Sequence, residues 1–155
     1  MAMRTEETID KLNGLIRVCR DGEELCGCGG VRASSAALRA LLLHRSEEWG
    51  RLGDELQALV LLLGGEPVTS ASFAARARRM RLALRVMLSG RNDAPLMDAW
   101  QRAQQRALRC YAEALGGYLP ERIRRTIGLQ ADRVMDRCDQ IGTLRVQLEI
   151  HSPAL

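Results

Sequence analysis

The sequence has little of what marks several common classes of protein. Aromatic residues make up only 3% of its 155 residues, and valine and isoleucine are sparse beside leucine and alanine. This composition favours helix over sheet, because alanine and straight-chain side chains lose little rotamer freedom in a helix. The sequence contains no phosphate-binding loop, strand signal or internal repeat. We therefore predict an all-α protein, and at this length we expect one domain with a core of its own.

Lysine is nearly absent: Lys11 is the only one, and arginine supplies the other basic side chains. Residues 1–66 carry 8 basic and 11 acidic side chains, whereas residues 67–155 carry 15 basic and 8 acidic ones. Such asymmetry is typical of a chain that binds an anionic partner, or of two halves of one bundle that attract each other. For a single domain we favour the second interpretation.

Long apolar runs are missing too. The longest, LQALVLLLGG, is too short to cross a bilayer, and no apolar segment of signal-peptide length follows the charged start MAMRTEETID. The cysteines number five, and Cys26 and Cys28 stand one residue apart. On a helix these two side chains lie about 200° apart, so a two-cysteine metal clip would require the helix to unwind. We therefore expect free thiols and a cytoplasmic protein.

Apolar residues recur with a helical period in five segments. The first begins at the Thr5 cap and is predicted to end at the glycines of GCGG, and the second runs from the serine cap in ASS to the stop signal GGEP. A shorter segment spans 72–88, and two long ones follow Asp93 and Pro120. Two antiparallel hairpins joined by a long crossover, which contains the shorter helix, form the topology of a ferritin-like four-helix bundle. We expect the bundle to occupy residues 1–150, with a tail at 151–155.

Four blocks of the sequence support this fold: LIRVCRDGEE, LLLHRSEEWGRLGDELQALVLLLGGEP, RCYAEALGGYLP and RVMDRCDQI. In their order and spacing they resemble an uncharacterised bacterial family of ferritin-like four-helix-bundle proteins, from about Ile9 to Leu144. The resemblance implies the fold and, by analogy with di-iron bundles, a metal site. It implies no established reaction.

The metal-ligand motif of such bundles is incomplete here. A carboxylate-bridged di-iron site typically takes one Glu from each of two helices and a Glu-x-x-His motif from each of the other two. Neither His44 nor His151 has an acid three residues before it. The resemblance also implies acids near positions 101 and 104 and a histidine near 138, where this chain has Gln101, Gln104 and Cys138. An amide supplies no anionic bridging oxygen, and a thiol is a softer donor.

Two hypotheses follow for the centre of the bundle. The preferred one is a non-catalytic ferritin-like bundle with a degenerate di-iron-type site and no expected cofactor. It acts as a structural or interaction protein that binds an unknown partner and self-associates as a homo-oligomer, most simply a dimer. Glu23, Glu48, Gln104 and Arg45 would then form a hydrogen-bonded layer. The alternative is a protein that binds iron or another divalent metal through Glu23, Glu48 and Cys138. No nucleophile is paired by spacing with a histidine, so we predict no catalytic residue.

A third hypothesis concerns the basic segment SFAARARRMRLALRVMLSG, which contains no acid and lies between Glu66 and Asp93. Basic amphipathic helices bind anionic membranes or nucleic acid. The commoner explanation is a crossover helix that packs on the acidic first hairpin, or at a dimer contact. The candidate surface for an anionic partner consists of Arg76, Arg78, Arg79, Arg81 and Arg85.

Overall fold

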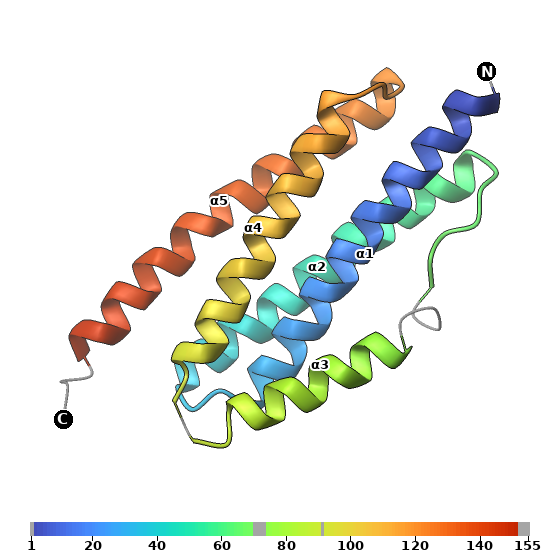
Figure 1. Ribbon diagram of the computed structural model, residues 1–155. Coiled ribbons are helices and arrows are strands. Elements are labelled where there is room, and N and C mark those ends of the chain that lie inside the picture. The colour runs from blue at the N-terminus through green and yellow to red at the C-terminus, as the bar shows by residue number, and fades with distance from the viewer. Residues whose placement is uncertain (1, 70–73, 91, 152–155) are drawn as a thin grey trace.

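Five α-helices make up the part of the chain that the structure describes, residues 2–69, 74–90 and 92–151. In this computed structural model no β-strand occurs within those ranges, in agreement with the all-α prediction. Four helices are long and lie side by side, and the shorter third helix lies against one end of them (Figure 1). The helices are α1 (Ala2–Arg32), α2 (Ala36–Leu62), α3 (Ala74–Met87), α4 (Ala94–Gly116) and α5 (Glu121–His151).

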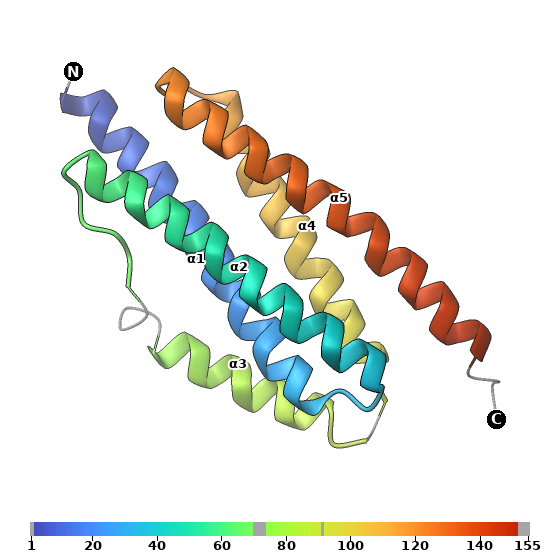
Figure 2. The same cartoon turned by 180° about the vertical axis from the view of Figure 1, so that it is seen from behind.

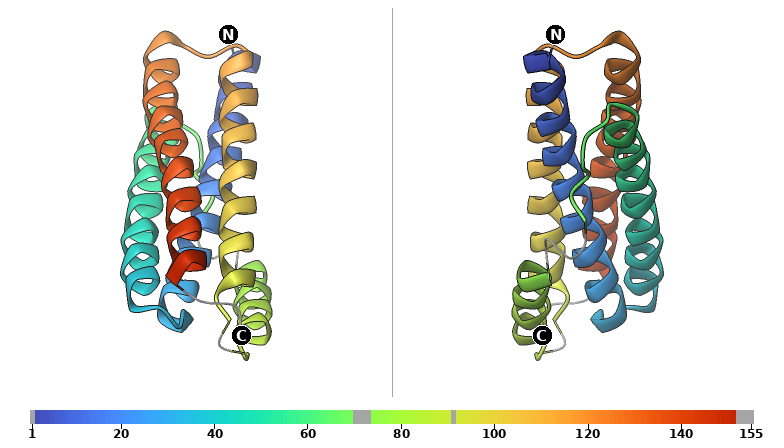
Figure 3. Two further views of the ribbon diagram at one scale, coloured as in Figure 1. Left: turned by 90° about the vertical axis from the view of Figure 1, so that its left-hand side faces the viewer. Right: turned by 90° about the vertical axis from the view of Figure 1, so that its right-hand side faces the viewer.

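The long helices form two antiparallel hairpins, α1 with α2 and α4 with α5, each closed by a short turn (Figure 2). A long connection that contains α3 joins the hairpins, so the predicted order of elements is observed. α1 also packs against α4, and side chains link α2 to α5, which completes a four-helix bundle (Figure 3). None of the helices within the described ranges is long and apolar enough to cross a membrane.

Local capping signals explain where α2 begins and ends. Ser35 caps α2, because its hydroxyl oxygen accepts a hydrogen bond from the Leu38 amide at 3.3 Å. α2 ends at GGEP, where Gly64 adopts a left-handed φ of 79° that favours glycine. Asp93 precedes α4 but does not cap it through its side chain. Its carboxylate instead accepts hydrogen bonds from the backbone amides of Ser34 at 2.8 Å and Ser35 at 3.0 Å, which ties the α1–α2 turn to the start of α4.

α1 differs from the prediction at both ends. It begins before the predicted Thr5 cap and continues through the glycine-rich segment. The predicted helix end at these glycines is wrong, because neighbouring side chains fill the space beside them. A Cβ at Gly29 would lie 2.6 Å from a methyl group of Leu96, and one at Gly22 would lie 2.8 Å from the indole ring of Trp49. Close packing against α2 and α4, rather than helix termination, explains these glycines.

Other boundaries are close to the predicted ones. α3 ends at Met87, and its predicted first residues, 72 and 73, lie outside the described ranges. α5 begins directly after Pro120, as the sequence predicts. α5 also includes His151, which the sequence places in the tail, and residues 152–155 lie outside the described ranges.

The core lies between the four long helices and is built from one apolar stripe of each. Trp49, Trp100 and Tyr111 are 5%, 1% and 0% exposed, so these large aromatic side chains fill the core. Cys19 and Cys26 are completely buried and act as small apolar side chains. Burial raises the pKa of both thiols to about 12, which keeps them neutral near pH 7. All five cysteines of the chain are free.

The α4–α5 turn is fastened by side chains that bond to its backbone. The Lys11 ammonium donates a hydrogen bond to the Tyr118 carbonyl at 2.8 Å and pairs with Glu7 at 3.5 Å. Gly117 leaves room for this contact, since a Cβ there would lie 2.5 Å from Lys11 Nζ. Arg124 donates to the Gly117 carbonyl at 2.6 Å. The single lysine thus connects α1 to the turn that joins α4 and α5.

Candidate functional site

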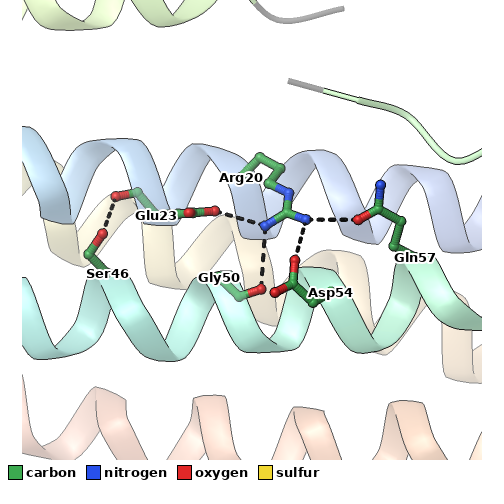
Figure 4. Close-up of polar contacts among 6 residues, drawn as sticks. All are labelled: Arg20, Glu23, Ser46, Gly50, Asp54 and Gln57. Carbon is green, nitrogen blue, oxygen red and sulfur yellow. Dashed lines mark hydrogen bonds and ion pairs between the residues drawn. The ribbon is translucent and has the colours of Figure 1, made fainter. Parts of the chain in front are cut away.

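Glu23 lies in the seam between α1 and α2, in a cluster organised by Arg20 (Figure 4). One guanidinium nitrogen of Arg20 donates to Glu23 at 2.9 Å and to the Gly50 carbonyl at 3.3 Å. The other donates to Asp54 at 2.8 Å and to Gln57 at 3.2 Å. Partial burial of Arg20 opposes its charge, but the hydrogen bonds to Asp54 and Glu23 outweigh that effect and raise the pKa of Arg20. The Glu23 carboxylate is therefore engaged in an arginine-centred network.

Glu48 lies on the opposite seam, where α2 faces α5, and three basic side chains contact it. Its Oε2 accepts a hydrogen bond from Arg45 at 2.8 Å. Its Oε1 lies 3.2 Å from Arg137 of α5 and 3.0 Å from His44 Nε2. Arg45 is 3% exposed and also donates to Gln140 of α5. Arg45 and Glu48 form part of the polar layer that the sequence predicts, whereas Glu23 belongs to a separate group with Arg20.

A cavity of about 230 Å³ adjoins Glu48 between α2 and α5. Gln104 of α4 lines it while being only 1% exposed, and its Oε1 has no hydrogen-bond partner among the described residues. The same holds for Nε of Arg45, which lies in the same wall. The cavity is lined by Arg45, Glu48, Trp49, Arg51, Leu52, Glu55, Gln104, Arg133, Val134 and Arg137.

A second buried polar group connects all four long helices, with Tyr111 of α4 at its centre. The Tyr111 hydroxyl donates to Gln130 Oε1 of α5 at 2.7 Å, and it lies 3.5 Å from the Cys19 sulfur of α1. Gln130 in turn donates to the Leu52 carbonyl of α2 at 3.3 Å. Burial raises the pKa of Tyr111 far above its usual value. With the thiol of Cys19 also protonated, this group is suited to holding helices together rather than to nucleophilic chemistry.

The three predicted metal ligands have different surroundings. Glu23 is bonded to Arg20, Glu48 is bonded to Arg45 and Arg137, and Cys138 is half-buried on α5 with its pKa raised by burial. Within residues 2–69, 74–90 and 92–151, no three or more His, Cys, Asp or Glu side chains are grouped so that they could hold a metal ion. A metal site at these three residues remains a prediction.

Cys28, the other half of the pair that invites a metal interpretation, stays on the intact helix α1. Its thiol donates to Glu24 Oε1 at 3.3 Å, whereas Cys26 is buried in the core. Burial and the neighbouring Glu24 carboxylate raise the pKa of Cys28 to about 11. The two cysteines therefore point away from each other, as their helical spacing predicts.

The arginines of α3 divide into two groups. Arg76 pairs with Asp21 at 2.8 Å and Arg81 with Glu24 at 3.2 Å, so α3 packs on the acidic first hairpin. This is the arrangement expected for a crossover helix. The other group is exposed to solvent and makes no ion pair with any described residue; it comprises Arg78, Arg79 and Arg85.

Sequence reasoning placed Arg45 beside Glu48 but missed Arg20, which binds Glu23, and Arg137, which also binds Glu48. Arg20–Glu23 and Arg45–Glu48 are both separated by three residues on a helix, a spacing at which side chains meet, so the sequence carried this signal. The contact of Arg137 with Glu48 had no such signal, because it depends on how α5 is placed against α2.

A family model described as "Domain of unknown function (DUF2383)" matches residues 7–117, well over half of the chain. The matched region covers α2, α3 and α4 and nearly all of α1. No curated protein matches the chain.

Proposed function

Because the chain belongs to this family of domains of unknown function, we propose a function from its own residues: it is a non-catalytic ferritin-like four-helix bundle that serves as a structural or interaction protein. Two antiparallel hairpins joined by a connection that contains α3 support the ferritin-like arrangement. In this proposal the di-iron-type site is degenerate, and arginine–carboxylate pairs stabilise the bundle in its place.

The observation that carries the proposal is the environment of Glu48. Both carboxylate oxygens are already in contact with basic groups, and Arg45 among them is almost completely buried. A metal ion that bound Glu48 would have to displace Arg45 or Arg137 and would then lie beside two positive charges. Displacing Arg45 would also leave a buried guanidinium without its counter-charge, which is strongly destabilising.

Gln104 supports the same conclusion. It is buried against the cavity next to Glu48, at a position where the family resemblance implies an acid. A neutral amide cannot supply the negative charge that offsets a pair of divalent cations in a carboxylate-bridged site.

The metal content of the purified protein tests this proposal. We would express the chain in iron-supplemented medium, reconstitute it anaerobically with Fe²⁺, Mn²⁺ or Zn²⁺, and measure bound metal by elemental analysis. We expect far less than one ion per chain, and the same low content in Glu23→Gln and Glu48→Gln. Glu47→Gln is the matched control, because Glu47 is an exposed acid on the same helix.

Two results would contradict the proposal. About two irons per chain, lost in Glu48→Gln but kept in Glu47→Gln, would establish a di-iron centre. A single metal ion that is lost in Glu23→Gln, Glu48→Gln and Cys138→Ala would establish the alternative site at those three residues.

Self-association as a dimer is part of the proposal. Three large apolar side chains of α5 are more than half exposed, and in this proposal they contribute to the dimer contact. Sedimentation equilibrium should give twice the chain mass of 17.2 kDa. Replacing the three by Gln should give the monomer mass, and a monomeric parent protein would refute this part of the proposal. They are Leu129, Met135 and Val146.

An anionic partner is a second candidate, and the unpaired arginines of α3 favour it. α4 adds three exposed arginines at helical spacing, and Arg106 and Arg109 line one hollow together with Arg76 of α3. Exposed arginines therefore continue from α3 onto α4, around a hollow that Asp21 and Glu113 also line. Those without an ion pair to any described residue are Arg78, Arg79, Arg85, Arg102, Arg106 and Arg109.

Salt-dependent retention on DNA and on anionic vesicles tests this second candidate. Replacing Arg78, Arg79 and Arg85 by Gln should abolish retention, because counterion release scales with the number of basic contacts. The matched control replaces three exposed arginines near the starts of α1 and α5, at the other end of the bundle (Figure 1): Arg4, Arg122 and Arg125. Equal retention of both variants would refute a specific surface on α3.

A further inference from the structure

The wall of the cavity between α2 and α5 carries more basic than acidic side chains. Four arginines and two glutamates line it, which gives a formal excess of two positive charges. Arg45 and Arg137 share Glu48 as their counter-charge, and Arg51 lies 3.7 Å from Glu47. Arg133 is exposed and makes no ion pair within the described part of the chain. The rim therefore presents basic groups that its own acids do not fully neutralise.

The floor of the cavity is apolar. Trp49, Leu52 and Val134 line it and are 5%, 8% and 2% exposed. The volume of about 230 Å³ is many times the roughly 10–15 Å³ that a cavity needs to hold one water molecule. It is also below the roughly 300–1,000 Å³ of sites for drug-sized ligands. A ligand smaller than a drug molecule, with an apolar body, matches this space.

Two buried polar atoms in the wall have no hydrogen-bond partner; one requires a donor and the other an acceptor. Gln104 Oε1 is a hydrogen-bond acceptor, and Arg45 Nε carries a donor. A buried polar group without a partner is destabilising, and native structures contain few of them. Both residues line this one cavity, so a single bound molecule with an acceptor and a donor can reach both.

We propose that this cavity binds a small hydroxycarboxylic acid. The carboxylate pairs with Arg133 and Arg137, which are four residues apart and so share one face of α5. Guanidinium groups suit this role because their planar fork matches a carboxylate. The apolar body of the ligand packs on Trp49 and Val134. Its hydroxyl donates to Gln104 Oε1 and accepts from Arg45 Nε, the two buried atoms without a partner. This binding role goes beyond the non-catalytic bundle proposed above and needs no metal ion.

Isothermal titration of the full chain in the presence of a chelator tests the proposal with four ligands. These are 2-hydroxy-4-methylpentanoate, 4-methylpentanoate without the hydroxyl, 4-methylpentan-1-ol without the carboxylate, and inorganic phosphate. We expect the hydroxy acid to bind tightest. Its affinity should exceed that of 4-methylpentanoate by about fivefold or more, because the hydroxyl satisfies a buried acceptor.

Three variants assign the contacts. Arg133→Gln should weaken binding of the hydroxy acid by about tenfold or more, because a charge-assisted hydrogen bond is lost. Arg133 is exposed and outside the core, so this variant keeps the fold. Gln104→Met should remove the preference for the hydroxy acid over 4-methylpentanoate. Arg125→Gln, an exposed arginine of α5 that does not line the cavity, should bind like the parent chain.

Any one of several results would overturn the proposal. They are no saturable binding of the hydroxy acid, equal affinity for the acid and the alcohol, phosphate binding at least as tight as the hydroxy acid, and unchanged affinity in Arg133→Gln. Equal affinity for the two acids would also refute it, because Gln104 would then have no part in recognition. Metal analysis of the same samples keeps this result separate from the test of the di-iron alternative.

Discussion

The Tyr111 hydroxyl is the centre of a buried chain of polar contacts that substitution can dissect. It donates to Gln130 Oε1 at 2.7 Å, and the amide nitrogen of Gln130 donates to the Leu52 carbonyl at 3.3 Å. Tyr111 and Gln130 are both 0% exposed, so water cannot replace a lost partner without entering the core. The hydrogen bonds therefore link α4, α5 and α2 inside the core, where a lost hydrogen-bond partner is not easily replaced.

We predict that Tyr111→Phe lowers the free energy of unfolding by about 1–3 kcal/mol, because it leaves the buried Gln130 oxygen without a donor. For a chain of this size, that loss corresponds to a fall in Tm of roughly 2–12 °C. Gln130→Leu should cost a similar amount, since it removes the acceptor for the Tyr111 hydroxyl and the donor to the Leu52 carbonyl. Cys19, at 3.5 Å from the hydroxyl, offers only a weak sulfur acceptor in compensation.

The double variant is the decisive measurement. With Phe at 111 and Leu at 130, neither polar group is left unpartnered, so the combined loss should be about 1 kcal/mol or more below the sum of the single losses. Urea unfolding followed by circular dichroism gives the four free energies of this cycle. Tyr118→Phe is the control: the ring is 44% exposed under the Arg4 guanidinium, and its loss of a hydroxyl should change stability by less than about 0.5 kcal/mol.

Additive losses, within about 0.5 kcal/mol, would show that the two side chains do not act as a pair and would refute this account. A Tyr111→Phe variant as stable as the parent would do the same, because the buried acceptor would then have found another donor.

Three further predictions rest on features of the fold. Gly22→Ala should lower stability by about 1–3 kcal/mol, because its methyl group would meet the indole ring of Trp49. Gly14→Ala, on the same helix but with open space around it, should raise stability by about 0.5–1 kcal/mol. Similar effects at both sites would contradict the packing argument. Asp93→Ala should cost about 1 kcal/mol in urea unfolding, since two amides of the α1–α2 turn lose a charged acceptor, and no loss would contradict that role. Burial raises the folded-state pKa of Cys19 and Cys26 to about 12, so the stability that their neutral thiols contribute is complete below about pH 9. That stability is lost as the pH rises from about 9 towards 12, with a slope of up to about 1.4 kcal/mol per pH unit for each thiol. A free energy of unfolding in urea that stays constant across this pH range would contradict the burial of neutral thiols.

Local signals predicted most of the helices. The Ser35 cap, the GGEP stop and the position of Pro120 act through neighbouring backbone groups, so they can be recognised from a few residues. The end of α1 could not be predicted in this way. Gly29 normally favours a helix end, but here it admits Leu96 of α4, and that contact exists only once the hairpins have packed.

The candidate site was predictable in part for the same reason. Arg45 and Glu48 share one helix face, so their pairing follows from the sequence. Placing Glu23 in the same layer as Glu48 requires the rotation of α1 against α2, which no short pattern sets, and Glu23 pairs with Arg20 instead. The cavity depends on α5 standing beside α2, so it was beyond any prediction from helical periodicity.

The single lysine allows one side chain of the molecule to be labelled selectively. An amine-selective reagent such as an activated ester finds one ε-amino group in the whole sequence, and that group is held between Glu7 and the Tyr118 carbonyl. Acylation there would erase the positive charge and break the clasp between α1 and the second hairpin. The rate at which Lys11 is acylated should therefore report how often that end opens, and mass spectrometry of the proteolytic peptide that contains Lys11 would measure it.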